Sequence, residues 1–257
     1  MVSASARGDF TELVVDRKHL LQSAAESDRP GQYYFVQAGA VATGGWHPFS
    51  VAYGDSDRIS FYVQAQGKGS WTRRLLIAAE GGAMVASLDG PYGGLSLRLE
   101  DYDSLYLIAG GSGITPLLNT LRLVLGSERY RAVRFVALHW AVRGPALVNL
   151  LRDKLEAALD LREAPSQEKL FMPEVLVNIW DTSSAGTGFH TEGGAKGILI
   201  SRGRVDISAV VGGIAPSMVG GTLQACVLVC GPAAMTQQTL AATTAAGIDC
   251  HIESFLL

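Results

Sequence analysis

The periodicity of the chain changes after the Gly- and Pro-rich turn DGPYGG at residues 89–94. Before this turn, short runs rich in β-branched and aromatic residues are separated by Gly, Pro and Asp, which predicts a small antiparallel β-barrel. After it, strand-like apolar runs alternate with segments of helical spacing, which is typical of a doubly wound parallel sheet. The sequence therefore predicts two domains, an antiparallel β-barrel at residues 1–100 and an α/β domain with a parallel sheet at residues 101–257.

The same patterns predict the individual elements. In the first domain we expect strands at residues 10–15, 32–37, 58–66 and 84–90. We also expect one helix at residues 70–82, with Ser70 or Thr72 as its N-cap. In the second domain we expect strands at residues 105–109, 133–142, 175–180 and 226–231 and helices at residues 116–125, 146–159 and 233–247. Residues 182–197 are rich in Gly, Ser and Thr, which is typical of a surface loop, and residues 209–221 receive no assignment.

Composition and charge argue against several classes of protein. Of the 257 residues, 48% are hydrophobic and 18% are charged, which is typical of a soluble globular protein. The net charge of -3 gives no reason to expect a nucleic acid as partner. The three cysteines, Cys226, Cys230 and Cys250, lack the spacing of a zinc site, so we expect no metal and a reducing compartment. With no apolar run of about 18 residues and no signal peptide, the chain as given is expected neither to cross a membrane nor to be exported.

The segment LYLIAGGSGITPLLN at residues 105–119 carries the first candidate binding site. An apolar strand leads into a tight glycine turn, after which Thr115 is the predicted cap of a helix and Pro116 its first residue. Such a turn exposes backbone N–H groups at the positive end of a helix dipole and lacks the Cβ atoms that would block a pyrophosphate. The competing interpretation is that the glycines serve only the close packing of helix on strand. The residues of this candidate site are Gly110, Gly111, Gly113, Ile114, Thr115 and Pro116.

Three further turns carry candidate site residues. In HPFS, residues 47–50, the proline is expected to end strand pairing and to hold the aromatic face of Phe49 beside the hydroxyl of Ser50. The turn GKGSWT at residues 67–72 enters a helix and predicts a second anion site by the same physics. In LVCGPAAM, a predicted strand ends at Cys230. The carboxyl ends of strands line the ligand crevice of a doubly wound sheet, so Cys230 is expected beside the ligand. Each turn also has a purely structural interpretation, as a strand end, a helix start or a buried cysteine.

Taken in order, the motifs PGQYYFVQ, HPFS, GSWT, DGPYG, GGSGITP, HWAVR, GR, CGP and ESF resemble the cytosolic dehydrogenase part of the ferric reductase and NADPH oxidase family, within the ferredoxin-NADP reductase superfamily. The resemblance extends over nearly the whole chain, from about residue 10 to residue 256. It implies an FAD-binding barrel followed by an NADPH-binding domain. It also implies electron transfer from NADPH to FAD and onward to haems, so haem is expected only in a membrane part that this sequence does not include.

The resemblance also implies roles for single residues. Phe49 would flank the flavin ring, and Ser50 would form a hydrogen bond near its N5 atom. Cys230 would lie beside the nicotinamide, Glu253 would relay or orient charge near the flavin, and Phe255 would cover the flavin face. The residues implied in catalysis are Ser50, Cys230, Glu253 and Phe255. Those implied in binding FAD are His47, Pro48, Phe49, Ser50, Gly69, Ser70, Trp71 and Thr72. Those implied in binding NADPH are Gly110, Gly111, Gly113, Ile114, Thr115, Pro116, Arg143, Arg204, Cys230, Gly231 and Pro232.

Two of these residues bear on the choice between NADPH and NADH. Arg143 in HWAVR and Arg204 in SRGR match positions that approach the adenosine 2′-phosphate in this family. A guanidinium group suits a phosphate dianion, and its absence would favour NADH. The alternative for each arginine is a solvated surface charge.

The sequence therefore predicts a flavin oxidoreductase that transfers hydride from NADPH to FAD and then single electrons to an acceptor. The first interpretation is the dehydrogenase domain of a ferric-chelate reductase on the cytosolic side of the plasma membrane. Its partner would be a haem-bearing transmembrane segment or protein. The alternatives are the dehydrogenase domain of a superoxide-generating NADPH oxidase, a soluble NADPH diaphorase and a non-catalytic nucleotide-binding regulator.

Overall fold

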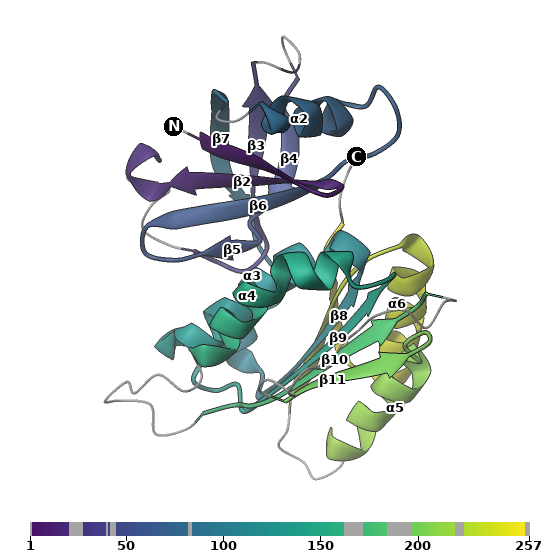
Figure 1. The fold of residues 1–257 in the computed structure, drawn as a ribbon. Coiled ribbons are helices and arrows are strands. Elements are labelled where there is room, and N and C mark those ends of the chain that lie inside the picture. The colour runs from purple at the N-terminus through teal and green to yellow at the C-terminus, as the bar shows by residue number, and fades with distance from the viewer. Residues whose placement is uncertain are drawn as a thin grey trace. The chain divides into compact units, whose positions relative to one another are not determined.

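The computed structural model describes residues 2–20, 28–39, 41, 45–81, 84–161, 172–183, 197–218 and 224–254. The chain divides between Gly94 and Leu95 into two compact units (Figure 1). The described part of the N-terminal unit consists of antiparallel strands and an α-helix, and that of the C-terminal unit consists of a parallel sheet with helices. The predicted fold class, an antiparallel β-barrel followed by a doubly wound α/β domain, is confirmed.

The strands of the N-terminal unit form two antiparallel sheets around one core. The first sheet has the order β1-β2-β6-β5 and the second the order β4-β3-β7. The bounds are β1 (Val2–Arg7), β2 (Phe10–Asp16), β3 (Gln32–Ala38), β4 (His47–Ser50), β5 (Tyr53–Gly54), β6 (Arg58–Gln64) and β7 (Ala86–Gly93). A bridge between Val2 and Met84 joins β1 to the residues just before β7. Leu13, Val36 and Phe61 come from both sheets and share one buried cluster, so the sheets close on each other.

The helix α2 (Trp71–Glu80) begins where the sequence predicts it. Ser70 is its N-cap, because the Ser70 Oγ atom accepts the N–H of Arg73 at 3.1 Å. Trp71 and Leu75 are one helical turn apart and both lie in the core shared by the two sheets. Capping and the spacing of the apolar residues therefore account for this helix together.

Pro48 corrects one detail of the sequence prediction. Instead of ending strand pairing, it lies inside β4 and pairs with Phe35 of β3. Because β4 is an edge strand, one of its sides needs no ladder hydrogen bonds, and a proline without an N–H is tolerated there. The predicted extended backbone at Phe49 and Ser50 is confirmed, since both lie in this strand.

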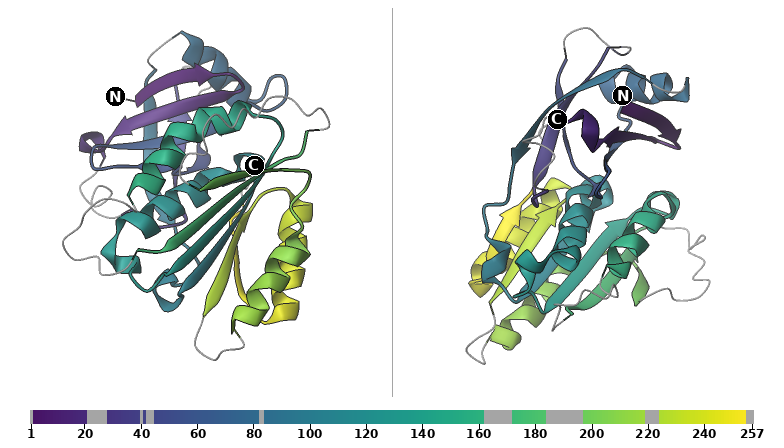
Figure 2. Two further views of the ribbon diagram at one scale, coloured as in Figure 1. Left: turned by 60° about the horizontal axis from the view of Figure 1, so that its bottom comes forward. Right: turned by 90° about the vertical axis from the view of Figure 1, so that its left-hand side faces the viewer.

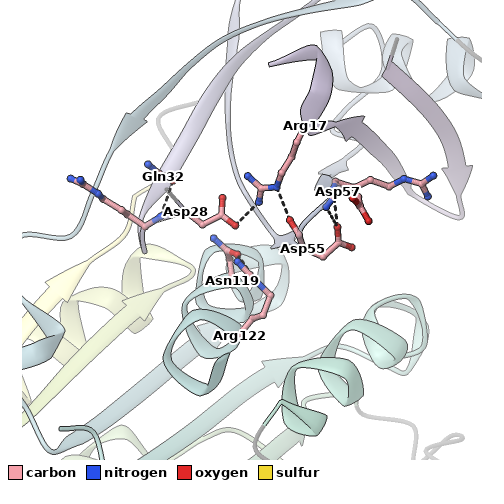
Figure 3. A network of polar contacts seen from close by, with 9 residues as sticks. Arg17, Asp28, Gln32, Asp55, Asp57, Asn119 and Arg122 are labelled. Atoms are coloured by element: carbon pink, nitrogen blue, oxygen red, sulfur yellow. Dashed lines mark hydrogen bonds and ion pairs between the residues drawn. The ribbon is translucent and has the colours of Figure 1, made fainter. Parts of the chain in front are cut away.

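A buried arginine ties together separate segments of the N-terminal unit (Figure 3). The Arg17 Nη2 atom donates to Oδ2 of Asp28 at 2.5 Å, and Nε donates to the carbonyl oxygen of Asp55 at 2.6 Å. Only 10% of the Arg17 side chain is exposed, so its charge depends on these partners for compensation. A Cβ at Gly54 would lie 2.7 Å from the guanidinium, which explains the glycine at that position.

The C-terminal unit is built on one parallel sheet with the order β11-β10-β9-β8-β12-β13. The chain runs outward from β8 through β9, β10 and β11, and then returns to place β12 and β13 on the other side of β8. The bounds are β8 (Ser104–Gly110), β9 (Phe135–Val142), β10 (Glu174–Asp181), β11 (Ile198–Arg202), β12 (Ala225–Cys230) and β13 (Asp249–Ile252). This order makes β8 and β12 the topological switch point of the sheet.

Helices cover both faces of this sheet (Figure 2). Their bounds are α3 (Ile114–Gly126), α4 (Ala146–Asp160), α5 (Ile207–Met218) and α6 (Ala233–Ala246). The described residues also contain the short 3-10 helices η1 (Arg17–His19), η2 (Leu99–Asp101), η3 (Gly111–Gly113) and η4 (Glu128–Tyr130). α3 contacts α4, and α5 contacts α6 on the opposite face. Because both faces are covered, the central strand β12 is apolar and buried at every position, from Ala225 to Cys230. No helix within the described ranges combines the length and the hydropathy of a membrane span.

Two helices differ from the sequence prediction. α3 begins at Ile114, so Gly113 occupies the cap position in place of Thr115, and Pro116 is the third helical residue in place of the first. Thr115 instead donates its hydroxyl to the carbonyl oxygen of Ser112 at 3.0 Å. The residues left without assignment, 209–221, include most of α5. The loop predicted at residues 182–197 falls largely outside the described residues.

Candidate functional site

The carboxyl ends of β8 and β12 place two of the predicted turns side by side. Ala109 pairs with Cys230 across the two strands, so the turns at residues 110–113 and 231–232 meet at the switch point of the sheet. In open α/β sheets, ligands bind in the crevice at this position. The fold thus joins two motifs that are far apart in the sequence.

These two turns pack so closely that their contacting positions have no room for a side chain. A Cβ on Gly113 would lie 2.2 Å from the carbonyl oxygen of Cys230, and a Cβ on Gly110 would lie 2.5 Å from Cδ of Pro232. A Cβ on Gly231 would lie 3.0 Å from the backbone nitrogen of Gly110. Close packing therefore requires glycine at all three positions.

Packing does not explain Gly111. Its φ of +54° lies in the left-handed region, and no heavy atom lies within 4 Å of the position that a Cβ would occupy. Its carbonyl oxygen is held by the Nε1–H of Trp140 in β9, at 3.0 Å. Gly111 thus offers a fixed backbone with open space beside it, which is what the close approach of a phosphate needs.

The start of α3 supplies favourable electrostatics for an anion. In the described structure no side chain caps the N-terminus of this 13-residue helix. Its first N–H groups therefore lack side-chain acceptors and lie at the positive end of the helix dipole. An uncapped helix that follows an open glycine turn fits the pyrophosphate of a dinucleotide.

Cys230, the last residue of β12, is fully buried. Burial, together with the charge of Glu253, raises the pKa of its thiol to about 12. The N–H of Glu253 donates to the carbonyl oxygen of Val229 at 2.9 Å, and its carboxylate lies 3.2 Å from Nε2 of His251. The structure therefore brings together two residues that the sequence implicates in catalysis, Cys230 and Glu253. Cys230 is a neutral thiol at physiological pH, which does not suit it to act as a nucleophile.

Burial should make the thiols of the folded chain slow to react. It also raises the pKa of Cys226 and Cys250. At pH 8 we expect the native protein to react with DTNB at least about tenfold more slowly than the urea-unfolded protein, because the thiolate is the reactive form. The rate of the unfolded protein should reach half of its plateau near pH 9, the ordinary pKa of cysteine, whereas the native rate should reach its half-maximum only at much higher pH.

The absorbance of the thionitrobenzoate released from DTNB measures the reaction rates of the native and the unfolded protein. A chain with Cys226→Ala and Cys250→Ala assigns the remaining rate to Cys230. Equal rates for this variant in the native and unfolded states would contradict the burial of Cys230.

Arg143 and Arg204 lie just beyond the carboxyl ends of β9 and β11, and both side chains are exposed. Their two strands flank β10, and all three strands run parallel to β8 and β12. Both arginines therefore lie at the carboxyl-terminal edge of the sheet, where the glycine turn and Cys230 also lie. This edge carries exposed positive charge that is available to a phosphate.

In the N-terminal unit, the HPFS and GSWT segments contact each other through aromatic rings. The centroid of the His47 ring lies 4.3 Å from that of Trp71, and Phe49 stacks on Trp71 at 5.8 Å. Burial lowers the pKa of His47, with a smaller contribution from the charge of Arg74, so His47 is largely neutral at pH 7. The two segments predicted to bind FAD thus form one cluster within this unit.

The backbone of the GSWT turn is fixed by local bonds. Gly69 has a φ of +79°, and the Thr72 hydroxyl oxygen accepts the N–H of Gln66 at 2.9 Å.

Ser50, at the end of β4, is buried, with 7% of its surface exposed. Phe255 lies outside the described residues.

A sequence profile of the family described as "Ferric reductase NAD binding domain" matches residues 102–244, more than half of the chain. The chain belongs to this family. The matched residues run from just before β8 into α6, so the NAD-binding domain includes both turns of the switch point.

Curated relatives of this NAD-binding domain include ferric reductases and NADPH oxidases. "Ferric reduction oxidase 8, mitochondrial" from Arabidopsis thaliana is 32% identical over 149 residues, which cover 54% of this chain and 20% of that protein. "NADPH oxidase 3" from Rattus norvegicus is 28% identical over 169 residues, which cover 61% of this chain and 30% of that protein. The chain thus spans between a fifth and a third of the length of these relatives.

Solved structures share the fold of the whole chain, the NAD-binding domain included. A ferredoxin NADP+ reductase from Neisseria gonorrhoeae, with bound FAD and NADP, is 14% identical with a TM-score of 0.62, and the match covers 98% of each chain. A flavohemoglobin from Malassezia yamatoensis is 20% identical with a TM-score of 0.61, covering 98% of this chain and 59% of that chain. The predicted resemblance to the ferric reductase and NADPH oxidase family, with a ferredoxin-reductase type of fold, is confirmed.

Two residues of the NAD-binding domain were not predicted as part of the site. Trp140 anchors Gly111, and Asp181, at the end of β10, accepts the N–H of Gly144 at 3.2 Å. An acidic residue directly after a predicted strand was the signal that could have identified Asp181. Among the described residues, no group of His, Cys, Asp and Glu side chains has the arrangement of a metal site.

Proposed function

We propose that the N-terminal unit binds FAD, that the C-terminal unit binds NADPH, and that the chain transfers hydride from NADPH to FAD and then single electrons to an acceptor. The proposed domain limits are residues 1–100 for FAD and 101–257 for NADPH. The observation that carries the proposal is the pair of interlocked turns at the switch point, where Gly110 and Gly113 abut Pro232 and Cys230. The match to an NAD-binding family and the likeness to a reductase with bound FAD and NADP support it.

The residues of the C-terminal unit fit NADPH. The glycine turn and the first turn of α3 would hold the pyrophosphate through backbone N–H groups. Arg143 and Arg204 would bind the 2′-phosphate, because a guanidinium fork can donate two hydrogen bonds to a phosphate dianion. Cys230, as a buried neutral thiol, would give the nicotinamide side of the crevice an uncharged wall.

The residues of the N-terminal unit fit FAD. The buried Nε1–H of Trp71 has no hydrogen-bond partner among the described residues, so the start of α2 retains a donor for a ligand. The backbone N–H groups of Gly69–Thr72 would bind the FAD pyrophosphate, and Phe49 would flank the flavin ring. Ser50 would orient the flavin. The family resemblance also implies flavin roles for Glu253, which belongs to the C-terminal unit, and for Phe255, which lies outside the described residues.

FAD and NADPH, when bound, supply the hydride and electron-transfer chemistry. The chain's own residues would bind and orient the two cofactors. We propose a ferric chelate as the terminal acceptor, reached through haem in a membrane segment or partner, with this chain on the cytosolic side of the plasma membrane. The similarity to ferric reduction oxidases supports the choice of a ferric chelate as acceptor.

Oxygen is the second candidate acceptor. The similarity to NADPH oxidase 3 covers 61% of this chain, compared with 54% for ferric reduction oxidase 8. A chain of this kind would pass its electrons to oxygen and form superoxide.

Anaerobic reduction of the flavin tests the proposal. The full chain, loaded with FAD, should lose its yellow absorbance when NADPH is added, because hydride transfer reduces the flavin. Yellow absorbance that persists at saturating NADPH would contradict hydride transfer and favour a non-catalytic nucleotide-binding protein. Adding a ferric chelate or oxygen to the reduced protein then compares the two acceptors by the rate at which the absorbance returns.

A further inference from the structure

Asp181 occupies the centre of the edge that carries the two arginines. It is the last residue of β10 and pairs with Val142 at the end of β9 and with Arg202 at the end of β11. Only 6% of its surface is exposed, although it carries a carboxylate. A buried acid at a ligand-binding edge needs specific partners.

The side chain of Asp181 holds the turn that carries Arg143. Its Oδ1 atom accepts the N–H of Gly144 at 3.2 Å and the N–H of Ser183 at 2.9 Å. Its Oδ2 atom accepts the Ser183 hydroxyl at 2.9 Å. The neighbouring Thr182 N–H donates to the carbonyl oxygen of Val142 at 2.9 Å, so Arg143 is bonded on both sides to the end of β10.

The backbone of Asp181 holds the turn that carries Arg204. Its carbonyl oxygen accepts the N–H of Gly203 at 2.8 Å. Gly203 and Gly144 have φ values of +102° and +73°, so both turns adopt backbone conformations that other residues rarely reach. Asp181 therefore forms hydrogen bonds with the backbone of both turns that carry the arginines.

Both carboxylate oxygens of Asp181 accept hydrogen bonds from the chain itself. The bonds from Ser183 and Gly144, together with the charge of Arg202, keep the pKa of Asp181 below its ordinary value, so the group is ionised at neutral pH. An acid at the end of a strand in a dinucleotide-binding fold often accepts hydrogen bonds from the ribose hydroxyls, which favours NADH. Asp181 is not suited to that role, because its oxygens already accept bonds from the chain and it is buried.

We propose that Asp181 is a positioning residue that fixes Arg143 and Arg204 for a 2′-phosphorylated adenosine and thereby sets the preference for NADPH over NADH. The proposal rests on the proposed function of the two arginines as 2′-phosphate ligands. Asp181 acts through the two turns and does not itself contact the nucleotide.

Calorimetric titration of the FAD-loaded full chain with 2′,5′-ADP and with 5′-AMP tests the proposal without any turnover. The wild-type chain should bind 2′,5′-ADP at least about tenfold more tightly than 5′-AMP, because charge-assisted bonds to the extra phosphate are strong. Asp181→Ala removes the side-chain bonds to the turn of Arg143 and keeps the backbone bond to Gly203. It should weaken 2′,5′-ADP about tenfold, since small misplacements of a binding group are costly, and change 5′-AMP less than about twofold.

Asp181→Asn provides the rescue that a positioning role requires. Its amide oxygen can still accept the N–H groups of Gly144 and Ser183, and its NH2 can donate to the Ser183 hydroxyl. Affinity for 2′,5′-ADP should therefore stay within about threefold of wild type. Asp153→Ala, an exposed acid of α4, is the matched control and should bind both probes as wild type does.

The outcomes separate this inference from the proposed function. A wild-type chain without preference for 2′,5′-ADP would overturn both. A wild-type preference that Asp181→Ala retains, or a loss in Asp181→Ala that is equal for both probes, would overturn the positioning role alone. So would an Asp181→Asn variant as weak as Asp181→Ala. If circular dichroism shows that Asp181→Ala does not fold, Ser183→Ala removes one of the same bonds, and an unchanged ratio of affinities in that variant would overturn the inference.

Discussion

Replacing Arg204 with Glu is expected to raise the KM for NADPH by about 30- to 100-fold, because the proposed charge-assisted bond to the 2′-phosphate would be lost and a like charge would take its place. Arg204 is exposed and lies two residues beyond the end of β11, so the fold does not depend on its side chain. The KM for NADH should change less than about twofold, since NADH has no phosphate at that position. Steady-state rates with ferricyanide as the artificial acceptor give both constants.

Arg131→Glu is the matched control for this substitution. Arg131 is exposed and precedes β9, at the opposite edge of the sheet from the candidate site, and its replacement changes the net charge by the same amount. It should leave both KM values as they are. If Arg204→Glu raised the two constants equally, it would act on folding or on general electrostatics, and an unchanged KM for NADPH would remove Arg204 from the phosphate site.

Gly113→Ala should destabilise the C-terminal unit by about 3 kcal/mol, because the new methyl group would overlap the neighbouring turn. Its Cβ would lie 2.2 Å from the carbonyl oxygen and 2.6 Å from the carbonyl carbon of Cys230. Both are backbone atoms at the end of a buried strand, so they cannot move aside as a flexible side chain could. The turns must separate, and we expect binding of 2′,5′-ADP to fall with the stability.

Gly212→Ala is the matched control for this loss. Gly212 lies on the exposed side of α5, and no heavy atom lies within 4 Å of the position of a Cβ there. The substitution should raise the free energy of unfolding by about 0.5–1 kcal/mol, because alanine is the better helix former. Urea denaturation followed by circular dichroism compares the two variants, and a wild-type midpoint for Gly113→Ala would contradict the interlocking of the two turns.

The order and type of most elements could be predicted because their patterns are local. Turn residues separate the short strands of the N-terminal unit, and helical spacing follows each strand of the C-terminal unit. The start of α3 was predicted two residues late because Thr115 and Pro116 are the residues that usually begin a helix. In the structure, the 3-10 turn η3 leads directly into the helix, and the glycine before Ile114 takes the cap position.

α5 escaped prediction because its composition opposes its conformation. Gly212 and Gly213 lower the helix propensity of this segment. Tertiary packing decides the outcome, since Ile207, Val211 and Ile214 are spaced by four and three residues and lie in the core against β12. That spacing was the available signal for a helix.

The site could be predicted only as separate pieces. Glycine turns, arginines and the CGP turn are each visible in the sequence, but the contact between Gly113 and Cys230 depends on the pairing of β8 with β12. The bonds that join Asp181 to the turns after β9 and β11 depend in the same way on strand order. No local pattern contains this information, because it depends on which strands pair, and the paired strands β8 and β12 lie far apart in the sequence.

The strand order also means that the crevice of the C-terminal unit is complete only after β12, a late part of the chain, has been made. β8, α3, β9, α4 and β10 are consecutive and can pack on one another as soon as they leave the ribosome, whereas β12 begins only at Ala225. Until β12 docks, one side of β8 is an unpaired strand edge, and half of the crevice is missing. A dinucleotide can therefore bind only to a chain that has completed this last pairing, and its binding energy stabilises the finished sheet over every earlier intermediate.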